Sequence, residues 1–377
     1  MLNTLISPGS FLFIIFILFS LSFVFQLLFY WLIFLKIVRY KDPPLKQSPE
    51  AVSVVICAHN EFHHLREYLP LILEQDHPGF EVVVVNHASD DDTSFLLDQL
   101  SAKYPHLKIV DIKENLNFFT GKKFPLSIGI KSTANDIILL TDADCFPAGK
   151  HWITHLQSSL YDQKEIVLGY GAYAKTKGLL NKLIRFDTAQ IAVQYFSYAL
   201  SGIPYMGVGR NMAYRKSLFY RNKGFISHYR INSGDDDLFI NRVATRNNTG
   251  VVITPGSFTL SEPKQTFHHW ILQKRRHLTT ARLYRPVHKL LLGLYSLTQL
   301  IFWLSLILLL AFNYNILIIL PVFLLKTFSQ YYIFGRSCSK LGEKDLIPWI
   351  PLYEIFLLLL NSWLTITGLF TRSVKWR

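Results

Sequence analysis

The feature that most constrains this chain is a run of 25 residues, 11–35, without a charged side chain. Such a run is longer than a typical core helix, and as a helix it is long enough to cross about 30 Å of hydrocarbon. The residues before it are uncharged, and aromatic residues followed by Lys36 and Arg39 end it. A cleaved signal peptide would have a basic start and a shorter apolar run. We therefore predict an uncleaved transmembrane anchor over residues 1–40.

The C-terminal part is also apolar. Residues 290–325 carry no charge, and an Asn-Tyr-Asn turn interrupts them. This pattern predicts two membrane spans, near 290–312 and 316–334. A third apolar segment, 346–370, contains two prolines and Glu354, so that it can cross, lie at the interface or re-enter. The basic tail favours a segment that does not fully cross. We assign 290–377 to C-terminal transmembrane or interfacial helices.

The charges are concentrated between these apolar ends. The chain is 50% hydrophobic and only 17% charged, whereas residues 36–289 hold 32 Lys and Arg against 23 Asp and Glu. Basic residues next to membrane spans favour the cytoplasmic side. The three cysteines are widely spaced, which indicates reduced thiols and not a disulfide framework. We expect an integral protein of a plasma membrane, of the bacterial inner-membrane kind, with its central domain in the cytoplasm.

The central region begins with an α/β pattern. Apolar, β-branched runs alternate with helix-like stretches, and the predicted strands are 51–58, 81–89, 107–112 and 136–144. Continuous apolar strands separated by helices are typical of a mostly parallel sheet that is covered on both faces. Ligands of such sheets bind beyond the carboxyl ends of the strands. Polar clusters follow the first, second and fourth strands, so we predict the functional site at that edge of a domain spanning 50–262.

The first chemical motif is Asp142-Ala143-Asp144, which directly follows a buried strand. Two carboxylates at the end of such a strand are costly to bury without compensation. A hard divalent cation, Mg²⁺ or Mn²⁺, that bridges to phosphate oxygens would compensate them. The alternative interpretation is a solvated turn at the end of the strand.

The second motif is a run of three acids, Asp235, Asp236 and Asp237, after Gly234. Adjacent carboxylates repel one another and raise at least one pKa, which suits a general base. Acids also favour the N-terminus of a helix, where they interact with its dipole. Both interpretations can hold together.

The third motif lies in the basic segment 263–289, which has seven basic residues and no acid. One interpretation is a membrane-proximal helix that is attracted to anionic lipids. The other is that Gln273 and Arg276 hold a pyrophosphate and a donor sugar. Lys122 and Lys123 follow Gly121 and either meet phosphates or form a solvated pair.

These motifs, in this order and between membrane spans, resemble those of the membrane-bound family 2 glycosyltransferases. Hyaluronan synthase, cellulose synthase and ceramide glucosyltransferase belong to this group. The resemblance covers roughly residues 50–280 and extends to the flanking helices. It implies a GT-A fold (a Rossmann-like, mostly parallel sheet), a nucleotide-sugar donor, Mg²⁺ or Mn²⁺, and inversion at the anomeric carbon.

The resemblance also assigns roles to single residues. It implies a metal held by Asp142 and Asp144, and Asp236 as the base that deprotonates the acceptor. Asp235 and Asp237 stay as alternatives, because the acidic run matches the family's acidic pair in more than one register. The implied donor-binding residues are Glu61, His87, Lys123, Asp142, Gln273 and Arg276.

Two positions depart from the family's pattern. His87 stands where the family usually has an acid that contacts the nucleobase, and the acids 90–92 offer a substitute carboxylate. His277 follows Arg276 where a tryptophan is expected.

The expected function is therefore sugar transfer from a UDP- or GDP-sugar to a hydroxyl of a lipid-linked or membrane-emerging glycan. Membrane lipids are expected partners and nucleic acid is not. The alternatives are a processive polysaccharide synthase of the same family and a catalytically inactive membrane scaffold. The small number of C-terminal membrane segments argues against a polymer channel.

Overall fold

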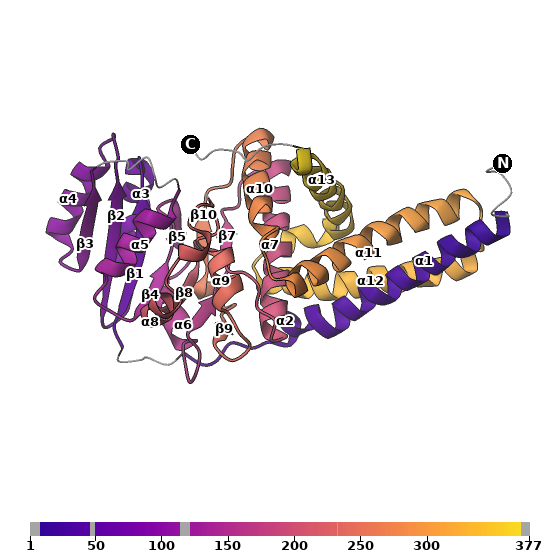
Figure 1. The fold of residues 1–377 in the computed structure, drawn as a ribbon, viewed down its shortest axis with the longest axis horizontal. Coiled ribbons are helices and arrows are strands. Elements are labelled where there is room, and N and C mark those ends of the chain that lie inside the picture. Colours follow the sequence, from indigo (N-terminus) through magenta and orange to yellow (C-terminus); the bar gives the residue numbers. More distant parts are fainter. Residues whose placement is uncertain (1–7, 46–49, 114–120, 232, 371–377) are drawn as a thin grey trace.

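The computed structural model describes residues 8–45, 50–113, 121–231 and 233–370. Strands and short helices form one end of the molecule, and long helices project from the other end (Figure 1). The helix α10 (Phe267–Ala281) lies where the two parts meet.

The central sheet has seven strands. Four of them, β1 to β4, are mutually parallel, and their carboxyl ends share one edge. The order across the sheet is β3 (Leu107–Ile112), β2 (Phe80–His87), β1 (Val52–Ala58), β4 (Ile137–Leu140), β8 (Met212–Arg215), β6 (Ile166–Leu168) and β9 (Thr249–Val251). β8 runs antiparallel to both of its neighbours. The prediction of a mostly parallel α/β sheet is confirmed.

Helices cover both faces of this sheet, because its strands bury apolar side chains on each side. One face packs against α3 (Phe62–Leu73), α4 (Thr93–Lys103) and α6 (Trp152–Ser158). The other face packs against α5 (Lys123–Ser132), α7 (Leu179–Leu200) and α9 (Asp237–Val243). The shorter helical turns are α8 (Lys216–Arg221), η2 (Ile226–His228) and η3 (Pro255–Ser257).

A second, small sheet begins with β5 (Cys145–Pro147), shortly after the carboxyl end of β4. Its order is β5, β10 (Thr259–Ser261) and β7 (Gly171–Tyr173). β10 leads into α10, whose first turn is capped by the Thr266 hydroxyl, 3.3 Å from the backbone nitrogen of His269. The basic segment predicted from the sequence thus contains α10 and the start of the next helix.

The N-terminal helix packs antiparallel against a C-terminal helix in the projecting bundle (Figure 1). It consists of α1 (Pro8–Leu28), the π-helical turn η1 (Phe29–Phe34) and α2 (Leu35–Arg39), and its partners are α11 (Pro286–Ala311) and α12 (Ile316–Lys340). The Phe19 and Phe302 rings stack with centroids 5.0 Å apart. The Gln26 amide donates to Thr298 Oγ1 at 2.7 Å.

The last helix, α13 (Ile350–Phe370), follows the turn η4 (Lys344–Trp349) and leaves the bundle at a steep angle to lie beside α10 (Figure 1). Near its start the Glu354 carboxylate pairs with Lys326 of α12 at 3.0 Å, and both side chains are buried. The segments 10–39, 286–311, 316–340 and 344–368 each have the length and apolar composition of a membrane span. α13 differs from the other three in its direction.

Candidate active site

The strand directions decide which residues meet at the edge of the central sheet that is formed by the carboxyl ends of β1 to β4. Leu140 at the end of β4 pairs with Met212 at the start of the antiparallel strand β8. The residues that follow β4 therefore lie beside those that precede β8. This arrangement brings Asp142 close to Arg210, a residue about 70 positions away in the chain.

The carboxylates of Asp142 and Asp144 lie together at this edge. One oxygen of each and the Cys145 sulfur all lie within 4.8 Å of one another. The Lys122 ammonium donates to Asp142 Oδ1. Burial opposes ionisation of Asp142, but the charge of Lys122, followed by those of Arg210 and Arg276, holds its pKa below the usual range.

The chemistry of this donor set fits a hard divalent cation. Asp142 and Asp144 offer carboxylate oxygens, which Mg²⁺ and Mn²⁺ prefer to a soft thiol such as that of Cys145. Phosphate oxygens and water would complete the coordination.

The two neighbouring lysines have separate places. Lys122 meets Asp142, whereas Lys123, which the sequence analysis predicts as donor-binding, points elsewhere. The Lys123 ammonium donates to the backbone oxygens of Ser233, at 2.5 Å, and Ile231. It thereby fixes the segment that leads into the three acids.

Asp237 is committed to structural contacts. Its Oδ2 accepts hydrogen bonds from the Tyr284 hydroxyl, at 2.8 Å, and from the Thr280 hydroxyl, and its Oδ1 accepts from the backbone of Leu238 at 2.7 Å. These donors occupy both carboxylate oxygens. Asp237 therefore ties α9 to α10 and to the segment after it.

Asp236 is oriented by backbone groups. Its Oδ1 accepts from the backbone nitrogen of Asp237 at 2.7 Å and caps α9, and its Oδ2 accepts from Gly209 at 2.8 Å. Burial and the charge of Asp237 raise the pKa of Asp236 to about 6. Burial and the charge of Asp236 likewise raise the pKa of Asp235 to about 6, while Lys122 opposes this rise. Both carboxyls are proton acceptors at neutral pH.

α10 crosses the same edge with its polar side chains. The Gln273 amide donates to the Tyr173 hydroxyl at 3.1 Å. The Arg210 guanidinium lies over the Tyr173 ring, 4.2 Å from its centroid, and donates to Ser261 Oγ at 2.8 Å. The charge of Arg276 also acts on Asp142. Arg276 and Gln273 of α10 therefore belong to the same cluster as the aspartates.

Glu61 is the N-cap residue of α3, which follows β1, and His87 ends the neighbouring strand β2. Glu61 Oε2 is 2.5 Å from His64 Nδ1; burial raises the Glu61 pKa and His64 opposes the rise. The backbone oxygen of His87 is 2.7 Å from His59 Nδ1, and burial, followed by the charge of His59, lowers the His87 pKa. Among the substitute acids, Asp91 accepts from the backbone of Phe62 at 3.2 Å and is used in that contact.

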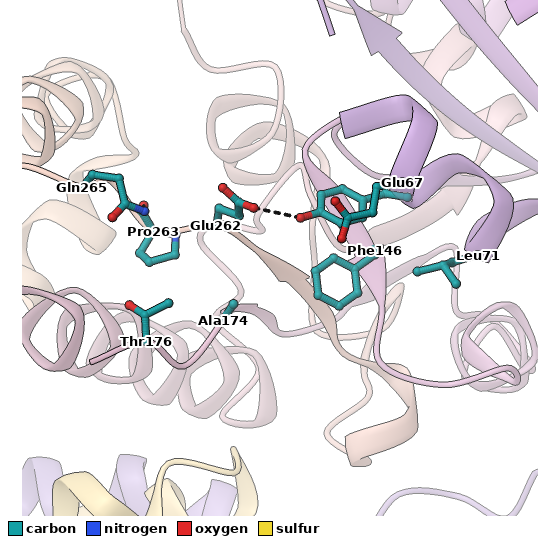
Figure 2. Close-up of a pocket in the computed structure, with 9 residues that line it drawn as sticks. Glu67, Leu71, Phe146, Ala174, Thr176, Glu262, Pro263 and Gln265 are labelled. Carbon is teal, nitrogen blue, oxygen red and sulfur yellow. Dashed lines mark hydrogen bonds between the residues drawn. The ribbon is translucent and has the colours of Figure 1, made fainter. Parts of the chain in front are cut away.

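A cavity of about 310 Å³ lies beside this cluster. Figure 2 shows it between Glu67 and Leu71 of α3, Phe146 of β5, and Glu262 in the segment after β10. The Tyr68 hydroxyl donates to Glu262 at 3.0 Å. None of its nine lining residues is a lysine or arginine. The cavity lining thus lacks the positively charged side chains that lie near Asp142.

The sequence analysis missed Arg210, and it did not distinguish Lys122, which contacts Asp142, from Lys123, which does not. Arg210 lies between Gly209 and a buried strand, but only the antiparallel direction of β8 brings it to Asp142. For the lysines, the distinguishing fact is the start of α5 at Lys123, which turns the two side chains in different directions. Neither fact is visible in the residue pattern.

Comparisons with known proteins agree with this geometry. The probable glycosyltransferase YdaM of Bacillus subtilis is 28% identical over 246 residues, which are 62% of this chain and 55% of that protein. The beta-monoglucosyldiacylglycerol synthase of Synechocystis is 33% identical over 95 residues, 25% of this chain and 19% of that protein. The chain thus spans only about half, or less, of these relatives.

A solved structure shares the fold. The mannosyltransferase PcManGT from Pyrobaculum calidifontis, solved in complex with GDP-Man and Mn²⁺, superposes with a TM-score of 0.58 at 19% identity. The superposition covers 91% of this chain and 98% of that one. Residues 49–280, more than half of the chain, match the family described as glycosyltransferase like family 2. The motifs of this chain, its GT-A fold and the match to the family model together place it in family 2 of the glycosyltransferases.

Proposed function

We propose that the protein transfers a sugar from a nucleotide-sugar donor to a hydroxyl of a lipid-linked or membrane-associated acceptor, with inversion and with Mg²⁺ or Mn²⁺. The observation that carries the proposal is the charge arrangement around Asp142, where Lys122, Arg210 and Arg276 all act on one carboxylate. Three positively charged side chains thus lie near a pair of aspartates whose spacing suits a metal ion. Such an arrangement suits the binding of a diphosphate. The GDP-Man complex of PcManGT supports this donor class.

Each side chain then has a proposed role. Asp142 and Asp144 would hold the cation, which when bound would supply positive charge against the leaving diphosphate. Lys122, Arg210 and Arg276 bind the diphosphate, and Gln273 lies within the same cluster. Glu61 and His87, at the ends of α3 and β2, lie on the nucleoside side.

Asp236 is the proposed base. Two backbone N–H groups fix its carboxylate, and its pKa of about 6 leaves it ionised at neutral pH. It takes the proton of the acceptor hydroxyl while that oxygen bonds to the anomeric carbon and the bond to the diphosphate breaks. One base and one displacement give inversion.

The membrane helices support an acceptor at the bilayer surface. α10 carries Gln273 and Arg276 and has α13, an apolar helix, beside it (Figure 1). An acceptor held in the bilayer therefore reaches the site without leaving the membrane surface. We infer that the catalytic domain faces the cytoplasm and that α13 lies along the interface without fully crossing.

The test is nucleoside diphosphate release by the full chain in detergent, screened with UDP- and GDP-sugars. We expect release with at least one donor, its loss in excess chelator and its recovery on addition of Mn²⁺ or Mg²⁺. Asp144→Asn should lower the rate at least 100-fold, whereas Asp98→Asn, on the exposed side of α4, should retain it. Full activity in excess chelator would contradict the proposed metal dependence. No release of nucleoside diphosphate with any donor would contradict the proposed sugar transfer.

A further inference from the structure

α10 presents basic side chains on two different faces. Gln273, Arg276 and Thr280 are spaced by three and four residues, so they share one side of the helix, which faces the sheet. Arg275 and Arg282, the C-cap residue that follows α10, are seven residues apart and share another side. This second side faces α13 and takes no part in the site described above.

The second face of α10 contacts α13 directly. The Arg275 guanidinium lies 5.4 Å from the centroid of the Trp363 ring. Arg282 Nη2 donates to the backbone oxygen of Gly368 at 2.9 Å. Arg275 Nε is buried and lacks a hydrogen-bond partner. Across the described residues, neither arginine forms an ion pair with an acid.

The surrounding sequence offers no compensating charge. The segment 263–289 has no acid, and α13 has none after Glu354. The Glu354 carboxylate is already bound by Lys326 and by the Gln299 amide, at 3.0 and 2.5 Å. The Arg275 guanidinium therefore adjoins an apolar helix without an anion, and partly buried charged groups are normally paired. Arg282, two turns further along, is exposed and adds a second positive charge beside α13.

The adjoining face of α13 is apolar and exposed. Its exposed side chains follow a spacing of four, three, four and three residues, which places them in one stripe; they are Leu352, Phe356, Leu359, Trp363 and Ile366, each between 36% and 60% exposed. The opposite side of α13 is buried. Trp363 belongs to the stripe, so the Arg275 guanidinium lies at the edge of a hydrocarbon-like surface.

We propose that the seam between α10 and α13 binds the phosphate of a lipid-linked acceptor. The phosphate oxygens would contact Arg275 and Arg282, whose planar guanidinium groups match them, and the lipid chain would lie along the α13 stripe. Arg275 precedes Arg276, which acts on Asp142, so the seam adjoins the donor site. The proposal rests on the proposed function and names the class of its acceptor.

The test uses fluorescent farnesyl phosphate as the probe and the full chain in detergent. Arg275→Gln should weaken binding at least tenfold, Arg275→Lys should recover part of the affinity because it keeps the charge, and Arg66→Gln, an exposed control on α3, should bind like the wild type. If Arg275→Gln does not fold, as judged by its thermal midpoint, Arg282→Gln tests the same site. Equal binding by wild type and folded Arg275→Gln would overturn the proposal.

Two competitors separate the parts of the ligand. Unlabelled farnesol, which lacks the phosphate, should compete poorly, and effective competition would contradict phosphate binding. Inorganic phosphate at the probe concentration should also compete poorly; effective competition would show a simple phosphate site and contradict the lipid. Donor hydrolysis by the wild type provides the independent check. If the wild type does not hydrolyse any donor, the proposed function fails. If it does, and Arg275→Gln binds the probe as well as the wild type, only the proposed phosphate site at the seam is contradicted.

Discussion

Replacing Asp236 by Asn should lower turnover by about 10²–10⁴-fold, the usual contribution of a general base. The amide retains an oxygen to cap α9, but its NH₂ group then faces the Gly209 N–H, which loses its acceptor. The fold should survive with a loss of about 1–3 kcal/mol. The wild-type rate should also depend on pH. With a pKa of about 6, the carboxylate is about 90% ionised at pH 7 and about 10% ionised at pH 5. Because the ionised form is the base, activity falls as the pH falls through 6, about two units above the range of an ordinary aspartate.

The assay is steady-state nucleoside diphosphate release at saturating donor and metal between pH 5 and 8. Asp235 and Asp236 repel one another, so the profile reports the apparent pKa of the pair. Asp237→Asn should keep most of the turnover but lose about 1–3 kcal/mol of stability, because Thr280 and Tyr284 lose an acceptor. An inactive, folded Asp237→Asn together with an active Asp236→Asn would refute the assignment, as would a rate that is constant down to pH 5.

Three further predictions follow from single contacts. Lys326→Met leaves the Glu354 charge buried without its partner and should lower the free energy of unfolding by about 3–5 kcal/mol, whereas exchanging both residues for Met should restore most of it; thermal unfolding in detergent checks this, and an unchanged midpoint in the single variant would contradict it. Gly209→Ala places a Cβ 3.3 Å from that of Asp236 and should lower kcat more than it raises the KM of the donor, which steady-state kinetics measure. Arg276→Lys should lower kcat/KM at least tenfold, because an ammonium group does not reproduce the guanidinium fork; a twofold effect would remove this residue from the diphosphate site.

The strands were predictable because their apolar, β-branched runs reflect burial on both faces of a sheet. The run before Asp142 is one example, although the strand itself ends at Leu140 and the aspartates follow it in a turn. The antiparallel direction of β8 was not predictable, since residue patterns do not encode strand direction. For that reason the sequence did not indicate Arg210 as a neighbour of Asp142.

The three acids show a similar limit. Their chemistry indicated a base, but the choice among them depends on contacts with distant residues. Asp237 is set apart from its neighbours by Thr280 and Tyr284, more than 40 positions later, whose hydroxyls tie it to α10 and the segment after it. The direction of α13 was likewise not predictable, because its apolar pattern resembles that of the membrane spans. The ion pair between Glu354 and Lys326, which links α13 to α12, is a contact between distant residues.

The antiparallel packing of α1 on α11 has a consequence for the unfolded chain. Arg39 ends the N-terminal helix and Pro286 begins α11, so the intervening stretch of about 250 residues has both ends held by one helical bundle. A bundle that persists when the domain unfolds closes this stretch into a loop, as a disulfide would. For a loop of this length the chain-entropy relation gives about 5.5 kcal/mol of stabilisation. The catalytic domain excised from its helices should therefore lose this amount of stability in addition to the packing of α2 against α7. Its folded state is thus stabilised by a tether that contributes no side chain to the proposed chemistry.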